Sequence, residues 1–248
     1  HYQADGTFVF AQTLAGQRSA RDIAISNSGA KWLATESTAP VQFSIGTAIP
    51  GAEGAPSTVT VAAGFRGVSF DSYGNLWASA RSASDLRRFN YPQAGVIYGT
   101  SSANAFVPSV YMPRGLAFEN NSPGAALWAC ISTGPTVGGT SRIARYASTG
   151  GGNLEASPSA QLTASVVRPQ SIAFQPGSGH MWVTQSGPAN AIVDETVVRY
   201  SRLAAAPNYD DFNRLVFQTK AVVYQPEGIA FDRRRQPDLW VATPSSGA

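Results

Sequence analysis

The pattern of hydrophobic and polar positions along the chain repeats five times, and each copy predicts two β-strands. The first run of each copy has an aliphatic residue, a small residue and then Phe or Ile, and the second is centred on a tryptophan. Apolar runs without strict alternation indicate strands that are buried on both faces. The first runs are 21–25, 66–70, 114–118, 170–174 and 227–231, and the second runs are 31–35, 76–79, 127–130, 181–184 and 239–242.

All five tryptophans of the chain occupy the same place in this repeat. Successive tryptophans are 45 to 58 residues apart. A period of this size with strand-like units predicts a propeller or another repeat array. Because apolar residues flank each tryptophan, we expect the rings to be buried between neighbouring units rather than to stack on a sugar. The five residues are Trp32, Trp77, Trp128, Trp182 and Trp240.

Two further apolar runs follow each tryptophan and complete a four-stranded unit, which is the composition of a propeller blade. The third runs are 41–43, 87–89, 144–146 and 198–200. The fourth runs are 57–62, 105–110, 160–166 and 214–223.

The fifth unit ends after two strands, and the missing two are found at the start of the chain. His1-Tyr2 matches the third run, and 7–14 reads as an outer strand. The sequence therefore predicts one all-β domain over 1–248, a five-bladed β-propeller with four-stranded blades. Its ring is closed by N-terminal outer strands joining C-terminal inner strands. The expected blades are 17–63, 64–110, 111–166, 167–223, and 224–248 together with 1–16.

Composition excludes several classes of protein. The charge is +3 with only 13% charged residues, and the densest basic cluster, Arg233 to Arg235, reads as an exposed turn, so we expect no nucleic-acid partner. No apolar stretch reaches 18 residues, so no membrane span is predicted. The single cysteine excludes an intramolecular disulfide. Low charge, many turn residues and a start other than Met favour a secreted, cell-surface or virion-associated setting.

The segments 226–232 and 67–77 resemble NHL-type repeats and the repeats of gluconolactonase/senescence-marker-protein propellers. The resemblance covers nearly the whole chain and implies a propeller fold. The chain departs from both families in having five recognisable copies rather than six. It also lacks the Asp that often follows the second strand of NHL repeats.

The candidate binding site is the mouth of the central channel. The residues that lead into the innermost strands occupy one equivalent position, so we expect them to form a ring with the residues that follow the second strands. Arg is suited to fork-like recognition of carboxylate, sulfate or phosphate. The alternative is that each Arg pairs with a neighbouring group and fills the channel. The candidate residues are Arg21, Arg66, Arg114, Gln170, Glu227, Glu36, Arg81 and Gln185.

Two functions are compatible with this mouth. The preferred one is a non-enzymatic binding module, of adhesin, fibre or scaffold type, for a protein partner or an anionic glycan, without a cofactor. The alternative is a gluconolactonase-like hydrolase. That resemblance implies a divalent cation held by a channel Glu with Asn and Asp, and Glu227 matches the Glu. The other ring positions are Arg or Gln rather than the oxygen ligands that a hard cation prefers.

We expect no catalytic residue elsewhere in the chain. Cys130 occupies a place held in other copies by Ala, Ser or Thr, so it is predicted to be core. His180 precedes a strand, and a Ser-His-Asp triad has little support. The segment 71–75 has too few oxygen ligands for calcium and reads as an Asx-type turn.

Overall fold

The structure is a computed structural model, and it consists of β-strands joined by turns. It describes residues 20–25, 31–35, 44–46, 65–80, 85–89, 102–106, 111–120, 122–133, 141–163, 166, 168–186, 196–203, 209–218, 227–231 and 239–242. Within these ranges there is no helix, and hence none that could cross a membrane. The predicted all-β class is confirmed.

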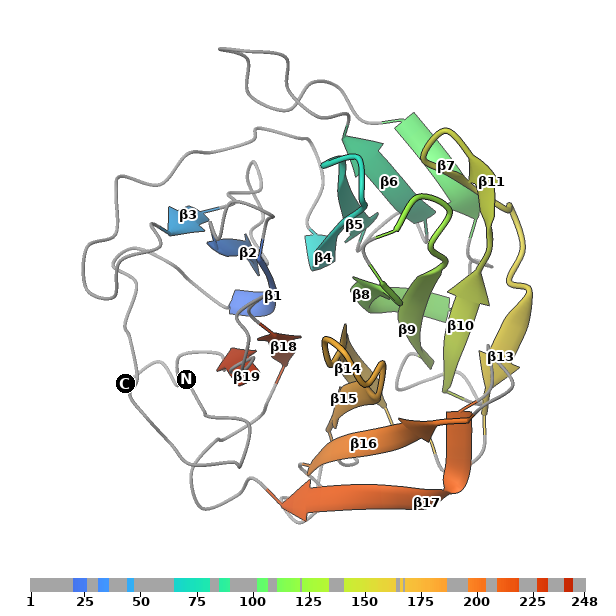
Figure 1. Cartoon of the computed structure of the whole chain (residues 1–248). Helices are drawn as coiled ribbons and strands as arrows, with labels where there is room; N and C mark the ends of the chain where they lie inside the picture. Colours follow the sequence, from blue (N-terminus) through green and yellow to red (C-terminus); the bar gives the residue numbers. More distant parts are fainter. Residues whose placement is uncertain are drawn as a thin grey trace.

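Among the described residues, five sheets are arranged around a common centre, each with one strand innermost (Figure 1). Each innermost strand contacts the innermost strand of the next sheet, in the cyclic order β1, β4, β8, β14, β18 and back to β1. The innermost strands are β1 (Ala20–Ile25), β4 (Phe65–Phe70), β8 (Tyr111–Phe118), β14 (Pro169–Phe174) and β18 (Gly228–Phe231).

The second strand of each sheet pairs antiparallel with the innermost one and carries the tryptophan. These strands are β2 (Lys31–Thr35), β5 (Leu76–Ala80), β9 (Leu127–Thr133), β15 (Met181–Gln185) and β19 (Leu239–Ala242). The outer strands are β3 (Ser44–Gly46), β6 (Asp85–Phe89), β7 (Ser102–Phe106), β10 (Arg142–Tyr146), β13 (Ala160–Leu162), β16 (Thr196–Arg202) and β17 (Tyr209–Gln218).

The outer strands differ from the predicted runs in extent. The fourth strand of two sheets begins several residues early, at Ser102 and Tyr209, because pairing with the third strand extends into polar sequence. A small hairpin of β11 (Ser148–Gly150) and β12 (Asn153–Leu154) was not predicted, and it turns through glycines with positive φ. The runs 57–62, His1-Tyr2 and 7–14 lie outside the described residues.

Three of the tryptophans join their sheet to the next. Trp77 and Trp128 are 0% and 1% exposed, and Trp182 is half-buried. The Trp77 ring meets Phe118 of the next sheet edge to face, with centroids 6.2 Å apart. Trp182 meets Phe231 in the same way at 5.9 Å, and Trp128 meets Phe174 in a tilted arrangement at 6.4 Å. The expectation of burial between units is confirmed for these three rings.

Each of these indole N–H groups is bonded to the residue that follows the inner strand of its own sheet. Trp77 Nε1 donates to the carboxylate of Asp71, Trp128 Nε1 to that of Glu119, and Trp182 Nε1 to the Gln175 side chain, over 3.1 to 3.3 Å. Each of these three indole N–H groups therefore keeps a hydrogen-bond acceptor although its ring is buried or half-buried.

The turn after β4 is the Asx-type turn that the sequence predicts. Asp71 Oδ1 accepts the backbone N–H groups of Tyr73 and Asn75, at 2.9 and 2.8 Å. Its Oδ2 accepts the Asn75 amide and the Trp77 indole. Both carboxylate oxygens are thus bonded to N–H donors within the hairpin.

Small residues at the ends of the second strands bridge adjacent sheets. The Ser79 hydroxyl accepts the Gly67 N–H at 2.7 Å and donates to the Arg114 carbonyl of the next sheet. Thr184 repeats this bridge with the Ser171 N–H, at 2.9 Å, and the Glu227 carbonyl, at 3.4 Å. Cys130 takes the equivalent place in the third sheet and is buried, as predicted.

We expect the Cys130 thiol to resist alkylation in the folded protein. Burial raises the pKa of this thiol well above its usual value, the charge of Asp22 raises it further, and Arg114 opposes the change. Since the thiolate is the nucleophile, iodoacetamide at pH 8 should label Cys130 at least about 100-fold more slowly than the urea-unfolded chain. Mass spectrometry of timed aliquots measures both rates, and equal rates would contradict the burial of the thiol.

Candidate functional site

A β-bulge occurs in four innermost strands at the position of the predicted ring. The register with the second strand shifts between Ala20 and Asp22 in β1 and between Phe65 and Gly67 in β4. It shifts between Pro113 and Leu116 in β8 and between Pro169 and Ser171 in β14. Bulges redirect side chains and are frequent beside active sites. The residues at these shifts are Arg21, Arg66, Arg114 and Gln170.

These bulges lie at the same end of the ring. Equivalent residues of neighbouring inner strands touch, as a Cβ on Gly67 would meet Arg114 and one on Gly115 would meet Ser171. The inner strands therefore run in the same direction, and their amino-terminal ends share one face. We call this face, with Arg66, Arg114, Gln170 and Glu227, the mouth.

Arg114 and Gln170 are bonded to each other at the mouth. Arg114 Nη1 donates to Gln170 Oε1, and Gln170 Nε2 donates to the Arg168 carbonyl at 2.9 Å and to the Ser186 hydroxyl at 2.5 Å. Gln170 is only 5% exposed, whereas Arg114 is half-buried. The predicted neighbours in the ring are thus held in one hydrogen-bonded group.

Arg168 has a φ of 41°, which is the one positive value for a residue other than glycine in the described part of the chain. Its carbonyl accepts Gln170 Nε2 and also the Ser186 N–H, at 3.3 Å. A non-glycine residue in this region costs about 1 to 3 kcal/mol and is often found at functional sites. These two bonds hold the strained backbone in place.

The other ring residues differ in how far the structure describes them. Arg66 is half-buried and its Nη1 lies 3.9 Å from Met112 Sδ of the next sheet. Glu227 is half-buried and immediately precedes β18. The Arg21 side chain, Glu36 and Arg81 lie outside the described residues. For these residues a role in binding stays a prediction.

The Gln185 side chain is bonded within its own sheet. It is 5% exposed, and its Nε2 donates to the Tyr200 hydroxyl at 3.1 Å. Tyr200 is fully buried. The observed contact of Gln185 is therefore with the core.

Sequence reasoning missed two residues near the mouth, Arg168 and Asp22. The other copies share no residue type at the position of Arg168, so the repeat gave no signal for it. Asp22 was visible as the one charged residue at a position that is Gly or Ser in the other four copies. It is 1% exposed, accepts the Val68 N–H at 3.0 Å and accepts the Ser171 hydroxyl, so it links three sheets.

The described residues do not fit a divalent cation at the mouth. No group of three His, Cys, Asp or Glu side chains occurs among them. Arg66, Arg114 and Gln170 stand where oxygen ligands are needed, and clustered positive charge opposes a cation. The nearby carboxylate of Asp22 already accepts a hydrogen bond at each oxygen.

Solved structures that superpose on this chain identify the fold. A gluconolactonase from Xanthomonas campestris superposes with a TM-score of 0.58 over 92% of this chain and 70% of its own, at 14% identity. The calcium-binding protein regucalcin from Agrobacterium tumefaciens gives 0.57 over 92% and 68%, at 15% identity. The chain has a gluconolactonase-like β-propeller fold.

A third neighbour is a putative 6-phosphogluconolactonase from Bacteroides uniformis, with a TM-score of 0.54 over 97% of this chain and 66% of its own, at 12% identity. The chain thus spans about two thirds of the length of these three propellers. No family model matches the sequence, and no curated protein matches it.

These neighbours correct the expectation that the propeller is a non-enzymatic module. Gluconolactonase is an enzyme, and the neighbours favour the hydrolase alternative over the binding module. The expectation was wrong because it rested on the missing metal ligands at the ring. A missing cation site argues against one mechanism and not against catalysis. The identities are low, so the likeness establishes the fold and the activity remains to be proposed.

Proposed function

We propose that this chain is a lactone hydrolase whose substrate is a sugar lactone bearing a negative charge. The observation that carries the proposal is the set of equivalent bulges that places Arg66, Arg114 and Gln170 at the mouth, next to Glu227. The gluconolactonase and the putative 6-phosphogluconolactonase among the structural neighbours support the reaction class.

The guanidinium groups at the mouth are the reason for proposing a negatively charged substrate. Arg66 and Arg114 belong to adjacent sheets whose inner strands are in contact, so both lie on one side of the mouth. Arginine binds phosphate and carboxylate through paired N–H donors. In the proposal, Arg66 holds the anionic group and Arg114, oriented by Gln170, faces the lactone carbonyl.

Glu227 supplies the base in this scheme. It takes a proton from water, and the water oxygen bonds to the lactone carbonyl carbon. The oxyanion that forms is stabilised by Arg114. The ring C–O bond then breaks, its oxygen takes the proton back from Glu227, and the product is the open hydroxy acid. No step needs a cation.

The number of blades and the closure of the ring are also part of the proposal. We propose a five-bladed ring whose last blade combines 224–248 with 1–16, built from NHL-type repeats. The cyclic contacts of β1, β4, β8, β14 and β18 support this arrangement.

Replacing Arg114 with Ala is expected to lower kcat/KM for a phosphorylated sugar lactone about 100-fold, since it removes a donor to the oxyanion. Replacing Arg66 with Ala should instead raise KM about 10-fold for the phosphorylated lactone and leave an uncharged sugar lactone nearly unchanged. Titration of the acid released, with a chelator present, measures both variants and the parent.

Arg87→Gln is the control for loss of a positive charge. This arginine lies on β6 and pairs with Asp85 at 3.1 Å, away from the mouth, so hydrolysis should be unaffected. If the wild-type protein hydrolyses neither lactone, or if Arg114→Ala keeps full activity, the proposal is wrong.

A further inference from the structure

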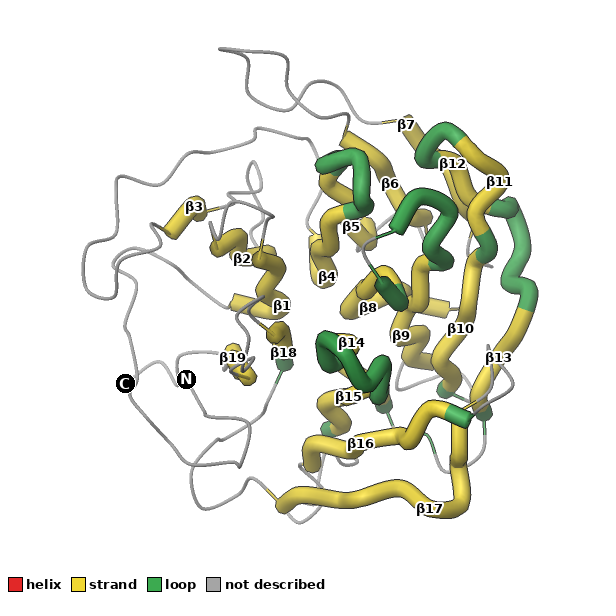
Figure 2. The backbone as a smooth tube through the Cα atoms, in the orientation of Figure 1, coloured by secondary structure: helices red, strands yellow, loops and turns green. Residues whose placement is uncertain are grey.

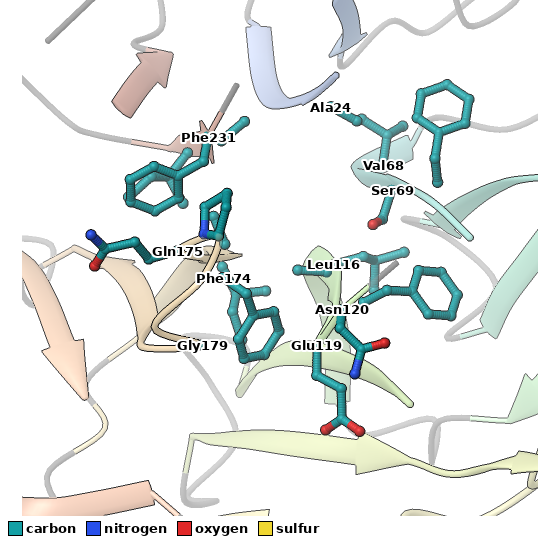
Figure 3. A pocket seen from close by; sticks show the side chains of 18 of the residues that line it. Ala24, Val68, Ser69, Leu116, Glu119, Asn120, Phe174, Gln175, Gly179 and Phe231 are labelled. Atoms are coloured by element: carbon teal, nitrogen blue, oxygen red, sulfur yellow. The ribbon is translucent and has the colours of Figure 1, made fainter. Parts of the chain in front are cut away.

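A cavity of about 470 Å³ opens at the end of the ring opposite the mouth. Its lining comes from the carboxyl-terminal ends of all five inner strands and from the hairpin turns that follow two of them (Figure 3). The hairpin turns gather round the middle of the view in Figure 2. The volume lies in the range of small-molecule sites, which is about 300 to 1,000 Å³.

The wall of this cavity is built from small side chains, one from each inner strand. They are 6% to 9% exposed, whereas many side chains of the second strands are fully buried. Phe70, Phe118, Phe174 and Phe231 complete an apolar lining. Such a wall favours a ligand with an apolar body. The small residues are Ala24, Ser69, Ala117, Ala173 and Ala230.

Polar and charged side chains also line the cavity. The Ser69 hydroxyl points into the open space in Figure 3. Asn120 and Arg202 also line the cavity, and both are exposed. Glu119 is the lining carboxylate, and it is bonded to Arg145 at 3.2 Å and to the Trp128 indole at 3.1 Å.

Gly179 gives the Arg202 guanidinium its place at the rim. The guanidinium lies close to Gly179, where a Cβ would be 2.9 Å from Arg202 Nη1, and the φ of +68° favours glycine at this position. The charge of Glu119 is balanced by its ion pair with Arg145. The charge of Arg202 therefore makes the rim net positive among the described lining residues.

We infer that this cavity is a second ligand site, which binds an amphiphilic organic anion with its apolar body among the small residues and its carboxylate at Arg202. The inference is independent of the proposed hydrolase, since the two sites lie at opposite ends of the ring. Decanoate and the uncharged decanol are suitable probes, and both are measured by displacement of the fluorescent sulfonate anilinonaphthalene sulfonate.

We expect one fluorophore to bind to each wild-type chain. Decanoate should bind at least about 10-fold more tightly than decanol, as measured by displacement of the fluorophore, because a carboxylate at an arginine gains charge-assisted hydrogen bonds. Arg202→Gln should abolish this difference, and Ser69→Leu should fill the cavity and weaken both ligands. Arg87→Gln should match the wild-type protein, as should Arg66→Ala at the mouth.

Arg202 is exposed, so its variant tests the inference even if Ser69→Leu fails to fold. Equal affinity of the wild-type protein for decanoate and decanol would overturn the inference. So would an unchanged preference in Arg202→Gln, or loss of fluorophore binding in Arg66→Ala, which would place the probe at the mouth.

Discussion

Gly67→Ala is expected to lower the free energy of unfolding by about 3 kcal/mol. A Cβ at this position would lie 1.9 Å from the Arg114 carbonyl oxygen and 2.7 Å from the Gly115 Cα, and both are backbone atoms of the next sheet. The two inner strands would have to separate, which would also disrupt the Ser79 bridge between Gly67 and Arg114. Urea unfolding followed by tryptophan fluorescence measures the loss.

Gly124→Ala is the matched control. It lies in a hairpin turn with a φ of +83° and nothing within 4 Å of a new Cβ, so only the backbone conformation opposes the change. That cost is about 1 to 2 kcal/mol. Equal losses in the two variants would show that β4 and β8 are not in backbone contact.

Trp128→Ala is expected to cost about 3 to 5 kcal/mol, the range for removal of a large buried aromatic. The ring is 1% exposed and meets Tyr209 edge to face, with centroids 5.4 Å apart, as well as Phe174. The variant also leaves Glu119 without its indole donor. The lost ring contacts act between the third and fourth sheets, and the lost hydrogen bond acts within the third sheet.

The comparison for this second variant is Tyr73→Ala. Tyr73 is 48% exposed in the hairpin after β4, so its removal should change the free energy of unfolding by less than about 0.5 kcal/mol. A loss below 1 kcal/mol for Trp128→Ala would mean that this ring does not hold the two sheets together.

The strands were predictable because burial on both faces leaves a continuous apolar signature around each tryptophan. Cys130 was correctly placed in the core for the same reason. The hydroxyl bridges of Ser79 and Thr184 were not foreseen, although the recurrence of Ser and Thr in that place was a usable signal. Apolar patterning treats such residues as small and does not register their hydrogen bonds.

The mouth was predictable only in part. Equivalence in the repeat predicted that Arg114 and Gln170 would be neighbours, and the structure joins their side chains by a hydrogen bond. The contact between Asp22 and Ser171 joins residues 149 positions apart, and no local pattern reports it. The positive φ of Arg168 is imposed by its tertiary partners and is also invisible in the sequence.

The double attachment of Trp77, Trp128 and Trp182 has a consequence for how the protein unfolds. Each indole packs on the next sheet while its N–H is bonded within its own sheet, so loosening one hairpin weakens both of the interfaces beside it. Nearest-neighbour coupling of this kind makes open arrays unfold from their ends, whereas the closed ring that we propose has no terminal unit to fray. Unfolding should therefore be a cooperative transition of the whole ring rather than a sheet-by-sheet melting.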